Sequence, residues 1–155
     1  MCKMLERIIK GLEKHIEGNS LMNNSQHGFR RGRSPQTNLI EFMNEVTKWM
    51  DDGKCFDIVY FDFGNAFDKV CHETLMTKLG AIGIKGKLYG WMKDWLKDRK
   101  QRVVKLKDGV ESGWQEVLSS VLQGSVLGGI LFNIFIDDVD EMVKALIRKS
   151  GGVRG

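Results

Sequence analysis

The sequence has a single proline and only three cysteines among its 155 residues. Cys2, Cys55 and Cys71 form no Cys-x-x-Cys pair and leave one thiol over, which argues against a disulfide framework and against a structural zinc site. A reducing cell interior is therefore the expected environment. The chain is long enough for one domain, and its 42% hydrophobic content predicts folding rather than disorder.

Long apolar runs are also lacking. The longest, from Val126 to Ile136, is interrupted by Asn133 and is shorter than the ~20 residues that cross a bilayer, so we interpret it as a buried helix. The sequence does not open with a charged segment and an apolar core, as a secretory signal would. These features predict an intracellular protein, cytoplasmic or nuclear, with no membrane partner.

The sequence also lacks a large excess of charge of either sign. Lys and Arg number 24 against 20 Asp and Glu, which gives a net charge of +4 and a pI near 9.0. This balance permits a polyanionic partner without requiring one. The most basic stretch, from Lys93 to Lys107, also contains Asp94 and Asp98, and we interpret it as a solvated face.

Hydrophobic periodicity and turn signals predict a mixed α/β (α+β) chain. Ser34 followed by Pro35 is typical of a helix start. The segment from Phe56 to Phe61 is short, apolar and β-branched, which favours a buried strand. The expected elements are helices ending near Gly18, over Pro35–Gly53, His72–Leu79 and Leu88–Leu96, the strand at Phe56–Phe61, a hairpin over Arg102–Val117 and a helix from Gly124 to about Leu146.

The stretch VYFDFGNAFDKV, residues 59–70, places Asp62 directly after the predicted strand and Asp68 six residues later. A protein kinase would need a glycine loop, a strand lysine and a His-Arg-Asp loop before Asp-Phe-Gly, and none precedes it. A haloacid-type phosphatase would need an acid two residues after Asp62, where Gly64 stands. From this stretch alone, Asp62 is either a metal ligand or a cap at the turn that follows the strand.

Four segments follow one another along the chain: CKMLERII (2–9), QHGFRRGRS (26–34), YFDFGNAFDKV (60–70) and LQGSVLGGILFNIFIDDV (122–139). In order and spacing they resemble motifs of the reverse transcriptase of LINE-type, non-LTR retrotransposons of the jockey and chicken-repeat kind. The third resembles the palm motif Leu-Asp-Phe-Ser-Lys-Ala-Phe-Asp-x-Val, and the fourth resembles Pro-Gln-Gly-Ser-Val-Leu-Gly-Pro. The resemblance covers about residues 2–143.

The resemblance implies an incomplete fingers-and-palm polymerase fragment with helices packed on a small sheet. Residues 1–53 would be fingers-like helices with an arginine loop, residues 54–146 a partial palm and residues 147–155 a tail. The activity implied for the family is RNA-directed DNA polymerisation, a nucleotidyl transfer on an RNA template and a DNA primer with deoxynucleotides. Two Mg²⁺ ions would stabilise the attacking oxygen and the leaving pyrophosphate.

The resemblance also gives roles to single positions. Asp62 matches the catalytic, Mg²⁺-binding carboxylate, and the Phe63 carbonyl would lie beside the second ion. Phe67 matches the aromatic residue under the incoming sugar, where a flat ring excludes a 2′-hydroxyl; an ordinary core phenylalanine is the alternative. Gln123 and Gly124 match the turn that lies against the nascent base pair.

Two further sets of residues follow from the same comparison. Arg30, Arg31 and Arg33 match a template-side loop, and guanidinium groups suit contacts to phosphate. Asp68 matches a family acid for which we expect a structural hydrogen bond rather than metal binding. The pair Asp137-Asp138 aligns with the end of the last helix, so its acids are expected at a helix end or at the surface.

The sequence departs from the family in ways that weaken the predicted site. The family's Tyr-x-Asp-Asp ligand motif does not occur, and neither does the Arg-Pro-Ile-Ser segment. Leu122 and Gly129 replace prolines, and Asn65 replaces a lysine. We therefore expect a weak or absent Mg²⁺ site, a chain that is inactive alone, and marginal stability from an uncovered sheet edge and uncovered helix faces. The alternatives are a non-catalytic nucleic-acid-binding or interaction module and a product with no selected role.

Overall fold

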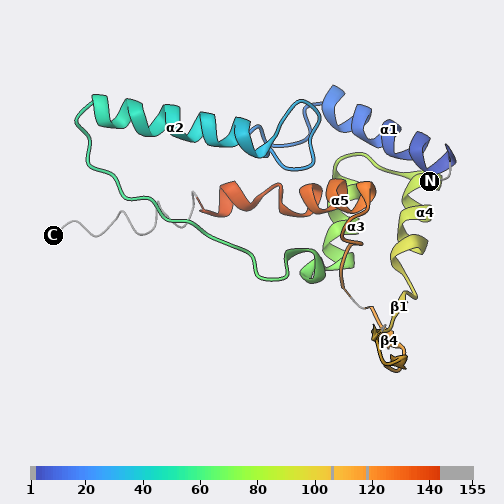
Figure 1. Cartoon of the computed structure of the whole chain (residues 1–155). Coiled ribbons are helices and arrows are strands. Elements are labelled where there is room, and N and C mark those ends of the chain that lie inside the picture. The colour runs from blue at the N-terminus through green and yellow to red at the C-terminus, as the bar shows by residue number, and fades with distance from the viewer. Residues whose placement is uncertain (1–2, 106, 118, 144–155) are drawn as a thin grey trace.

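The computed structural model describes residues 3–105, 107–117 and 119–143, and Figure 1 shows a helical body from which an arm and a hairpin project. The coarse class is α+β, as the sequence predicted. The elements are α1 (Lys3–Gly18), α2 (Pro35–Asp51), the 3₁₀ turn η1 (Ala66–Lys69), α3 (His72–Ala81), α4 (Gly86–Leu96), β1 (Lys100–Gln101), β2 (Val104–Lys105), β3 (Val110–Glu111), β4 (Gln115–Glu116) and α5 (Val126–Ile136).

The body is built around α5, which packs against α3 and α1, while α3 also packs against α4. Leu75, Leu79 and Leu131 are completely buried where these helices meet. Burying one such side chain contributes roughly 1.5–3 kcal/mol, so these three leucines are a substantial source of stability. The buried apolar residues are Ile9, Leu12, Ile16, Val70, Leu75, Met76, Leu79, Ile84, Met92, Leu96, Val121, Leu127, Ile130, Leu131 and Ile134.

The end of α1 and both ends of α2 lie close to where the sequence predicts them. α1 ends at Gly18. At the start of α2, the Ser34 hydroxyl accepts a hydrogen bond from the Thr37 N–H and the Thr37 hydroxyl accepts one from the Ser34 N–H, a reciprocal cap in front of Pro35. After α2, Gly53 adopts the left-handed conformation, with φ of +64°, that favours glycine at a helix end.

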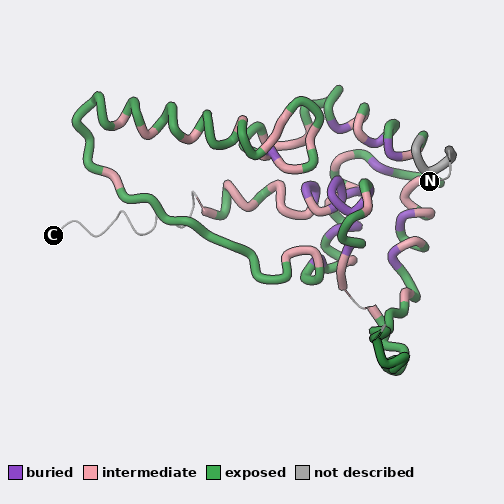
Figure 2. Tube along the Cα trace, viewed as in Figure 1, coloured by how far each residue is buried: buried purple, intermediate pink, exposed green. Residues whose placement is uncertain are grey.

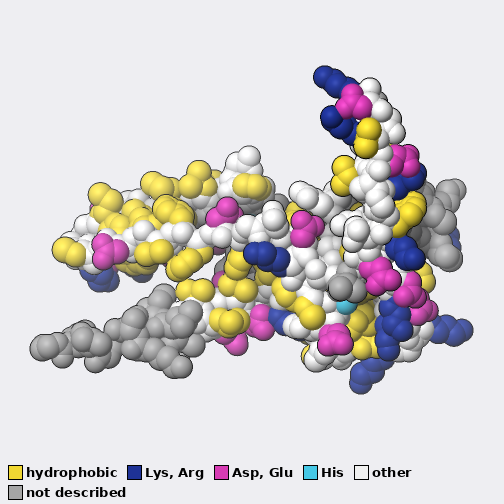
Figure 3. Space-filling model, turned by 90° about the horizontal axis from the view of Figure 1, so that it is seen from below, with side chains coloured by type: hydrophobic (Ala, Val, Ile, Leu, Met, Phe, Trp, Pro, Cys, Tyr) yellow, Lys and Arg dark blue, Asp and Glu magenta, His cyan; other side chains and the backbone are white. Residues whose placement is uncertain are grey.

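α2 and the segment that follows it, residues 52–64, form an arm with little buried surface (Figures 1 and 2). No residue of α2 is buried, and its apolar side chains Leu39 and Met50 are 60% and 65% exposed. The ring of Phe56 lies 5.3 Å from that of Trp49, but the side chains around this contact remain open. Figure 3 shows hydrophobic side chains gathered along the arm. Phe42 and Trp49 are half-buried against Tyr60 and Phe56, and most of the other apolar side chains of the helix are left largely open by the described residues.

The prediction of a strand at 56–61 is wrong for this structure. These residues are extended, yet they belong to no strand, and no N–H of residues 55–64 donates a hydrogen bond to the described backbone. A strand needs a partner that completes its ladder, and apolar β-branched sequence alone does not provide one. Val59, Tyr60 and Phe61 are consequently 69–79% exposed instead of buried.

The predicted hairpin is confirmed. β2 pairs with β3 and β1 pairs with β4, both antiparallel, and Gly109 in the connecting turn has φ of +61°. Its position differs from the expectation of helices packed on a small sheet, because the hairpin projects from the end of α4 (Figure 1). The sheet residues are exposed, and the core is made by helices.

α5 is shorter than the predicted helix from Gly124 to about Leu146. It ends at Ile136, a turn follows at Asp137-Asp138, helical residues resume at 139–143, and the remainder lies outside the described residues. The break is stabilised from two sides: Lys78 donates to the Phe135 carbonyl, and the Asn23 N–H donates to the Asp137 carboxylate over 2.7 Å. Within the described ranges, no helix is both long and apolar enough to cross a membrane.

Candidate nucleotide and nucleic-acid site

The arginine loop, residues 26–33, is fixed on α5 by one buried polar side chain, Asn133. The Gln26 amide donates to the Asn133 oxygen over 2.8 Å, and the Asn133 amide donates to the Gly28 carbonyl over 2.6 Å. A polar group inside an apolar helix is costly unless it is hydrogen-bonded, and here both ends of the amide are used. Asn133 interrupts the apolar run because it holds this loop, a role that the sequence analysis missed.

An aromatic cluster joins the same loop to the palm motif. The Phe67 ring stacks on Phe132 of α5 with centroids 4.6 Å apart, and Phe29 of the loop contacts Phe67 edge-to-face at 5.8 Å. Phe29 also lies directly against the bare backbone of Gly129, where an added Cβ would overlap its ring. Each aromatic pair contributes about 0.5–1.5 kcal/mol beyond burial, so loop, palm motif and α5 hold one another in place.

Backbone hydrogen bonds tie the end of the palm motif to the segment that precedes α5. The Val121 N–H donates to the Phe67 carbonyl over 3.0 Å, and the Ser120 N–H donates to the Val70 carbonyl over 3.0 Å. The Ser119 hydroxyl donates to the Asp68 carbonyl over 2.7 Å. The backbone of Asp68 therefore has a structural contact, while its side chain is exposed.

The predicted turn at Gln123-Gly124 leads into α5 as an exposed loop, with Gly124 at φ of +81°. Ser125 caps the helix, since its hydroxyl accepts the Gly128 N–H over 2.9 Å. A Cβ at Gly128 would overlap the Leu122 carbonyl oxygen. The segment before α5 can therefore lie this close to the helix only because residue 128 is a glycine. The turn therefore has a fixed position relative to Phe67.

Asp62 and Phe63 lie apart from this ordered region, on the exposed arm. Both side chains are exposed, and Phe63 is 55% accessible. No group of three His, Cys, Asp or Glu residues in the described part of the chain is placed to hold a metal ion. Mg²⁺ needs near-octahedral oxygen ligation, so the residues present do not form a complete Mg²⁺ site.

The acids after α5 are engaged elsewhere. Asp138 forms an ion pair with Lys78 of α3, and this hydrogen bond lowers the pKa of the Asp138 carboxyl below its ordinary value. Asp137 is the C-cap of α5 and accepts the Asn23 N–H. Their expected placement at a helix end and at the surface is confirmed.

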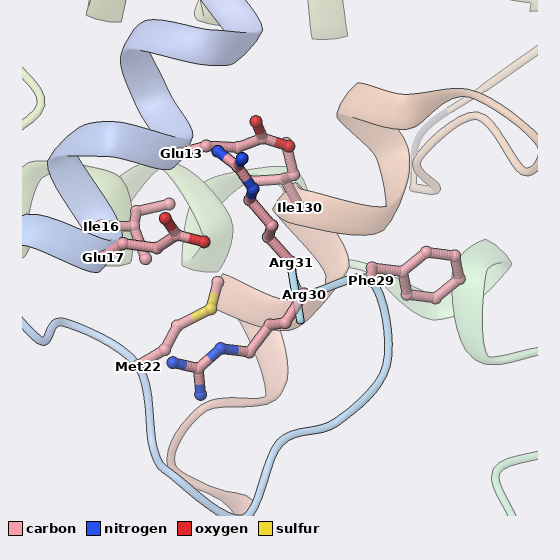
Figure 4. Close-up of a pocket in the computed structure, with 8 residues that line it drawn as sticks. All are labelled: Glu13, Ile16, Glu17, Met22, Phe29, Arg30, Arg31 and Ile130. Carbon is pink, nitrogen blue, oxygen red and sulfur yellow. The ribbon is translucent and has the colours of Figure 1, made fainter. Parts of the chain in front are cut away.

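The three arginines differ in what they contact. Arg30 donates to the Asn23 carbonyl over 2.7 Å, and Arg33 donates to the Asn24 carbonyl. Arg31 is exposed and forms no hydrogen bond or ion pair within the described residues. Figure 4 shows its side chain extending toward Glu13 of α1, whereas Arg30 points away toward Met22. Two guanidinium groups thus brace the loop, and one is available to a ligand.

A buried histidine braces the loop from the side of α2. His27 is 4% exposed, and its Nδ1 lies 2.8 Å from the Thr37 hydroxyl. Its Nε2 lies 3.1 Å from a guanidinium nitrogen of Arg33 and 3.1 Å from a carboxylate oxygen of Glu41. The Thr37 hydroxyl donates to the Ser34 carbonyl, so Nδ1 is assigned as the donor to Thr37 and Nε2 accepts from Arg33. This second function of Arg33 explains why it is half-buried, and the motif alone did not indicate it.

Comparisons with known proteins place the chain in a family. The model of the family described as "Reverse transcriptase (RNA-dependent DNA polymerase)" matches residues 1–150. The chain belongs to the reverse transcriptase family. The resemblance drawn from the four motifs to non-LTR retrotransposon enzymes is thereby confirmed.

Individual relatives of this reverse transcriptase chain agree. It is 28% identical over 140 residues to the probable RNA-directed DNA polymerase from transposon BS of Drosophila melanogaster, covering 90% of the chain and 15% of that protein. It is 30% identical over 114 residues to the polymerase from mobile element jockey of the same species, covering 74% and 12%. The group II intron-encoded protein LtrA of Lactococcus lactis is 32% identical, covering 79% and 18%. No solved structure matches.

This chain therefore spans less than a fifth of the length of these curated relatives. Three of the four family-like segments meet in one place, at α5: the arginine loop, the end of the palm motif and the Gln-Gly turn. The carboxylate of the palm motif is not among them.

The close return of the chain at Gly128 gives a direct test of this arrangement. Gly128→Ala should lower the free energy of unfolding by about 1–3 kcal/mol, because the new methyl group overlaps a backbone oxygen that has no free space to move into. Gly90→Ala is the matched control: Gly90 is also inside a helix, α4, with nothing within 4 Å, so it should be neutral or stabilising by up to ~1 kcal/mol. Urea unfolding measures both, and equal effects would contradict the packing described.

Proposed function

We propose that this chain is a fingers-and-palm portion of an RNA-directed DNA polymerase from a non-LTR retroelement. Residues 1–53 supply fingers-like helices with the arginine loop, residues 54–146 part of the palm, and residues 147–155 a tail. The observation that carries the proposal is the family match over residues 1–150, combined with the meeting of three motif segments at α5. RNA template, DNA primer and deoxynucleotides are the proposed partners.

In this proposal Phe67 forms the floor under the incoming sugar. One face of its ring is fixed on Phe132, and its backbone carbonyl is bound by Val121, so the ring has little freedom to move away from a 2′-hydroxyl. Gln123 and Gly124, two residues further along from Val121, would lie against the nascent base pair. Their exposure and the bare backbone of Gly124 suit close approach of a flat base.

Asp62 is proposed as the catalytic carboxylate and, with the Phe63 carbonyl, as part of an Mg²⁺ site. Bound metal ions would supply the charge stabilisation that phosphoryl transfer needs. Asp62 lies five positions before Phe67 in the sequence, but it is on the arm rather than in the ordered cluster. A lone exposed carboxylate binds Mg²⁺ weakly, so this chain by itself should be catalytically inactive.

Primer extension on an RNA template with deoxynucleotides and Mg²⁺ tests this proposal. The chain alone should give no extension above a no-protein background, since removing ligands from a two-metal site costs several orders of magnitude in rate. Extension that is seen with the wild-type chain and disappears in Asp62→Ala would show that the site is complete without further ligands, contrary to the proposal.

A second candidate function is nucleic-acid binding without catalysis, favoured by Arg31, the arginine of the loop that forms no hydrogen bond or ion pair within the described residues. Arg31 is exposed on a loop that the core holds rigidly, whereas the lining carboxylates Glu13 and Glu17 reduce the net charge of the groove in front of it. Binding through this loop would be electrostatic and therefore would weaken as salt rises.

Substitutions of Arg31 and of Arg30 should have different effects in a binding experiment with a short RNA. Arg31→Ala should weaken binding and lower the slope of log affinity against log salt by about one, with unchanged stability. Arg30→Ala should instead lower stability by about 1 kcal/mol, since the Asn23 carbonyl loses the shorter of its two hydrogen bonds and keeps only the one from the Gln26 N–H. Binding that is unaffected by Arg31→Ala and insensitive to salt would remove this candidate.

A further inference from the structure

The hairpin that follows α4, residues 99–117, carries an exposed tryptophan that neither the motifs nor the core uses. Trp114 is 61% exposed, and the residues on both sides of it are exposed as well. Figure 1 shows the hairpin projecting from the helical body, so Trp114 is not a core residue that happens to reach the surface. A large aromatic side chain left in water is a feature that needs an explanation.

The hairpin is nevertheless well defined by its own hydrogen bonds. The Ser112 N–H donates to the Val103 carbonyl and the Val103 N–H donates to the Ser112 hydroxyl, both over 2.9 Å. At its base the Val117 N–H donates to the Arg99 carbonyl over 2.8 Å. These bonds hold two-residue strands in register and present Trp114 on a constrained backbone.

The Trp114 ring is held in place from one side. The Arg102 guanidinium lies over it, 4.8 Å from the ring centroid, and Arg102 also forms an ion pair with Glu111 on the opposite strand. A guanidinium stacked on an indole and fixed by a carboxylate reduces the freedom of both side chains. The exposed remainder of the ring is therefore a flat apolar surface whose orientation is already set.

The sequence on either side of this surface has a small excess of cations. From Lys97 to Val117 the chain has six Lys and Arg against four Asp and Glu. Two of the acids are neutralised within the hairpin, by the pairs Arg102–Glu111 and Lys105–Asp108, and Glu116 lies opposite Lys100 in the strand register. Lys97, Arg99 and Lys107 have no carboxylate partner within the described residues, Asp98 has no cation partner there, and Arg99 lies over the Trp95 ring, 5.1 Å from its centroid. The hairpin thus combines one oriented aromatic surface with a modest positive excess.

We propose that the hairpin binds single-stranded nucleic acid, with one unpaired base stacked on Trp114 and the neighbouring phosphates beside the lysines. An aromatic platform within a positively charged surface is how proteins bind single strands without reading sequence, since every base has a flat face. A lipid surface fits less well, because four carboxylates are interspersed and the exposed valines do not form one apolar face.

This inference rests on the proposed function, since a polymerase portion works on a single-stranded template, but it can fail separately from it. The hairpin lies outside the arm that carries Asp62 and outside the loop that carries Arg31. A chain that does not extend primers can therefore still bind a single strand through Trp114. Conversely, a chain that extends primers can lack this binding.

The test compares Trp114→Ala with Val110→Ala, a matched control on the same hairpin whose side chain is also 61% exposed. The probes are a short oligouridylate RNA, the same strand in a duplex, a single-stranded DNA of equal length, and inorganic polyphosphate. Trp114→Ala should weaken RNA binding roughly 5- to 150-fold, the range that loss of one stacked base gives. Trp114→Phe should retain most of the affinity, and Val110→Ala should bind like the wild-type chain.

The other probes decide between stacking and charge. Polyphosphate binding should be the same in all variants, duplex should bind more weakly than the single strand, and single-stranded DNA should follow RNA. Unchanged RNA binding by Trp114→Ala, or an equal loss for RNA and polyphosphate, would overturn the proposal. Circular dichroism of each variant, matched to wild type, ensures that a loss does not come from unfolding.

Discussion

Two adjacent glycines on α5 are the constraint on which the rest of the structure depends. At Gly128 the missing side chain lets the Leu122 carbonyl return onto the helix, and at Gly129 it lets the Phe29 ring lie on the backbone. With Asn133 one turn further along, these positions bring the arginine loop, the Gln-Gly turn and Phe67 to one helix. Larger side chains there would keep the chain segments apart, however apolar the helix remained.

Because of this constraint, the two halves of the palm motif differ in the contacts that hold them. Its second half, from Phe67 to Val70, is held by stacking on Phe132 and by hydrogen bonds to residues 119–121. Its first half, with Asp62, has no ladder partner in the described chain, and its Tyr60 ring lies 6.2 Å from the Phe42 ring of α2. The part of the motif that would shape the nucleotide pocket is thus ordered by this chain, whereas the part that would hold metal is not.

Much of this could be predicted from the sequence because the signals are local. The Ser34 cap, the glycine ends of α1 and α2, and the turn at Gly109 all specify conformation within a few residues, and each appears where expected. The prediction of a strand at 56–61 was wrong because strand formation depends on a partner strand as much as on the segment's own sequence. Apolar β-branched residues form a strand when another strand completes the ladder, and nothing within those six residues supplies it.

The candidate site was predictable in its residues but not in their contacts. The motifs indicated three arginines with one role, whereas Arg30 and Arg33 brace the loop and only Arg31 is open to a ligand among the described residues. His27 and Asn133 looked like ordinary members of a loop and of an apolar helix, and their function depends on partners outside their own elements, such as Thr37 of α2 and Gln26 of the loop. Trp114 belongs to no motif and became conspicuous through its exposure.

Hydrogen exchange measured residue by residue tests most directly the claim that the half of the palm motif that carries Asp62 is unpartnered in this chain. The account predicts strong protection for the amides of α5 and α3, close to the global stability, and exchange of the amides of residues 56–63 near the rate of an unstructured chain. Protection of residues 56–63 equal to that of α5 would show that the segment is a paired strand and would contradict the account.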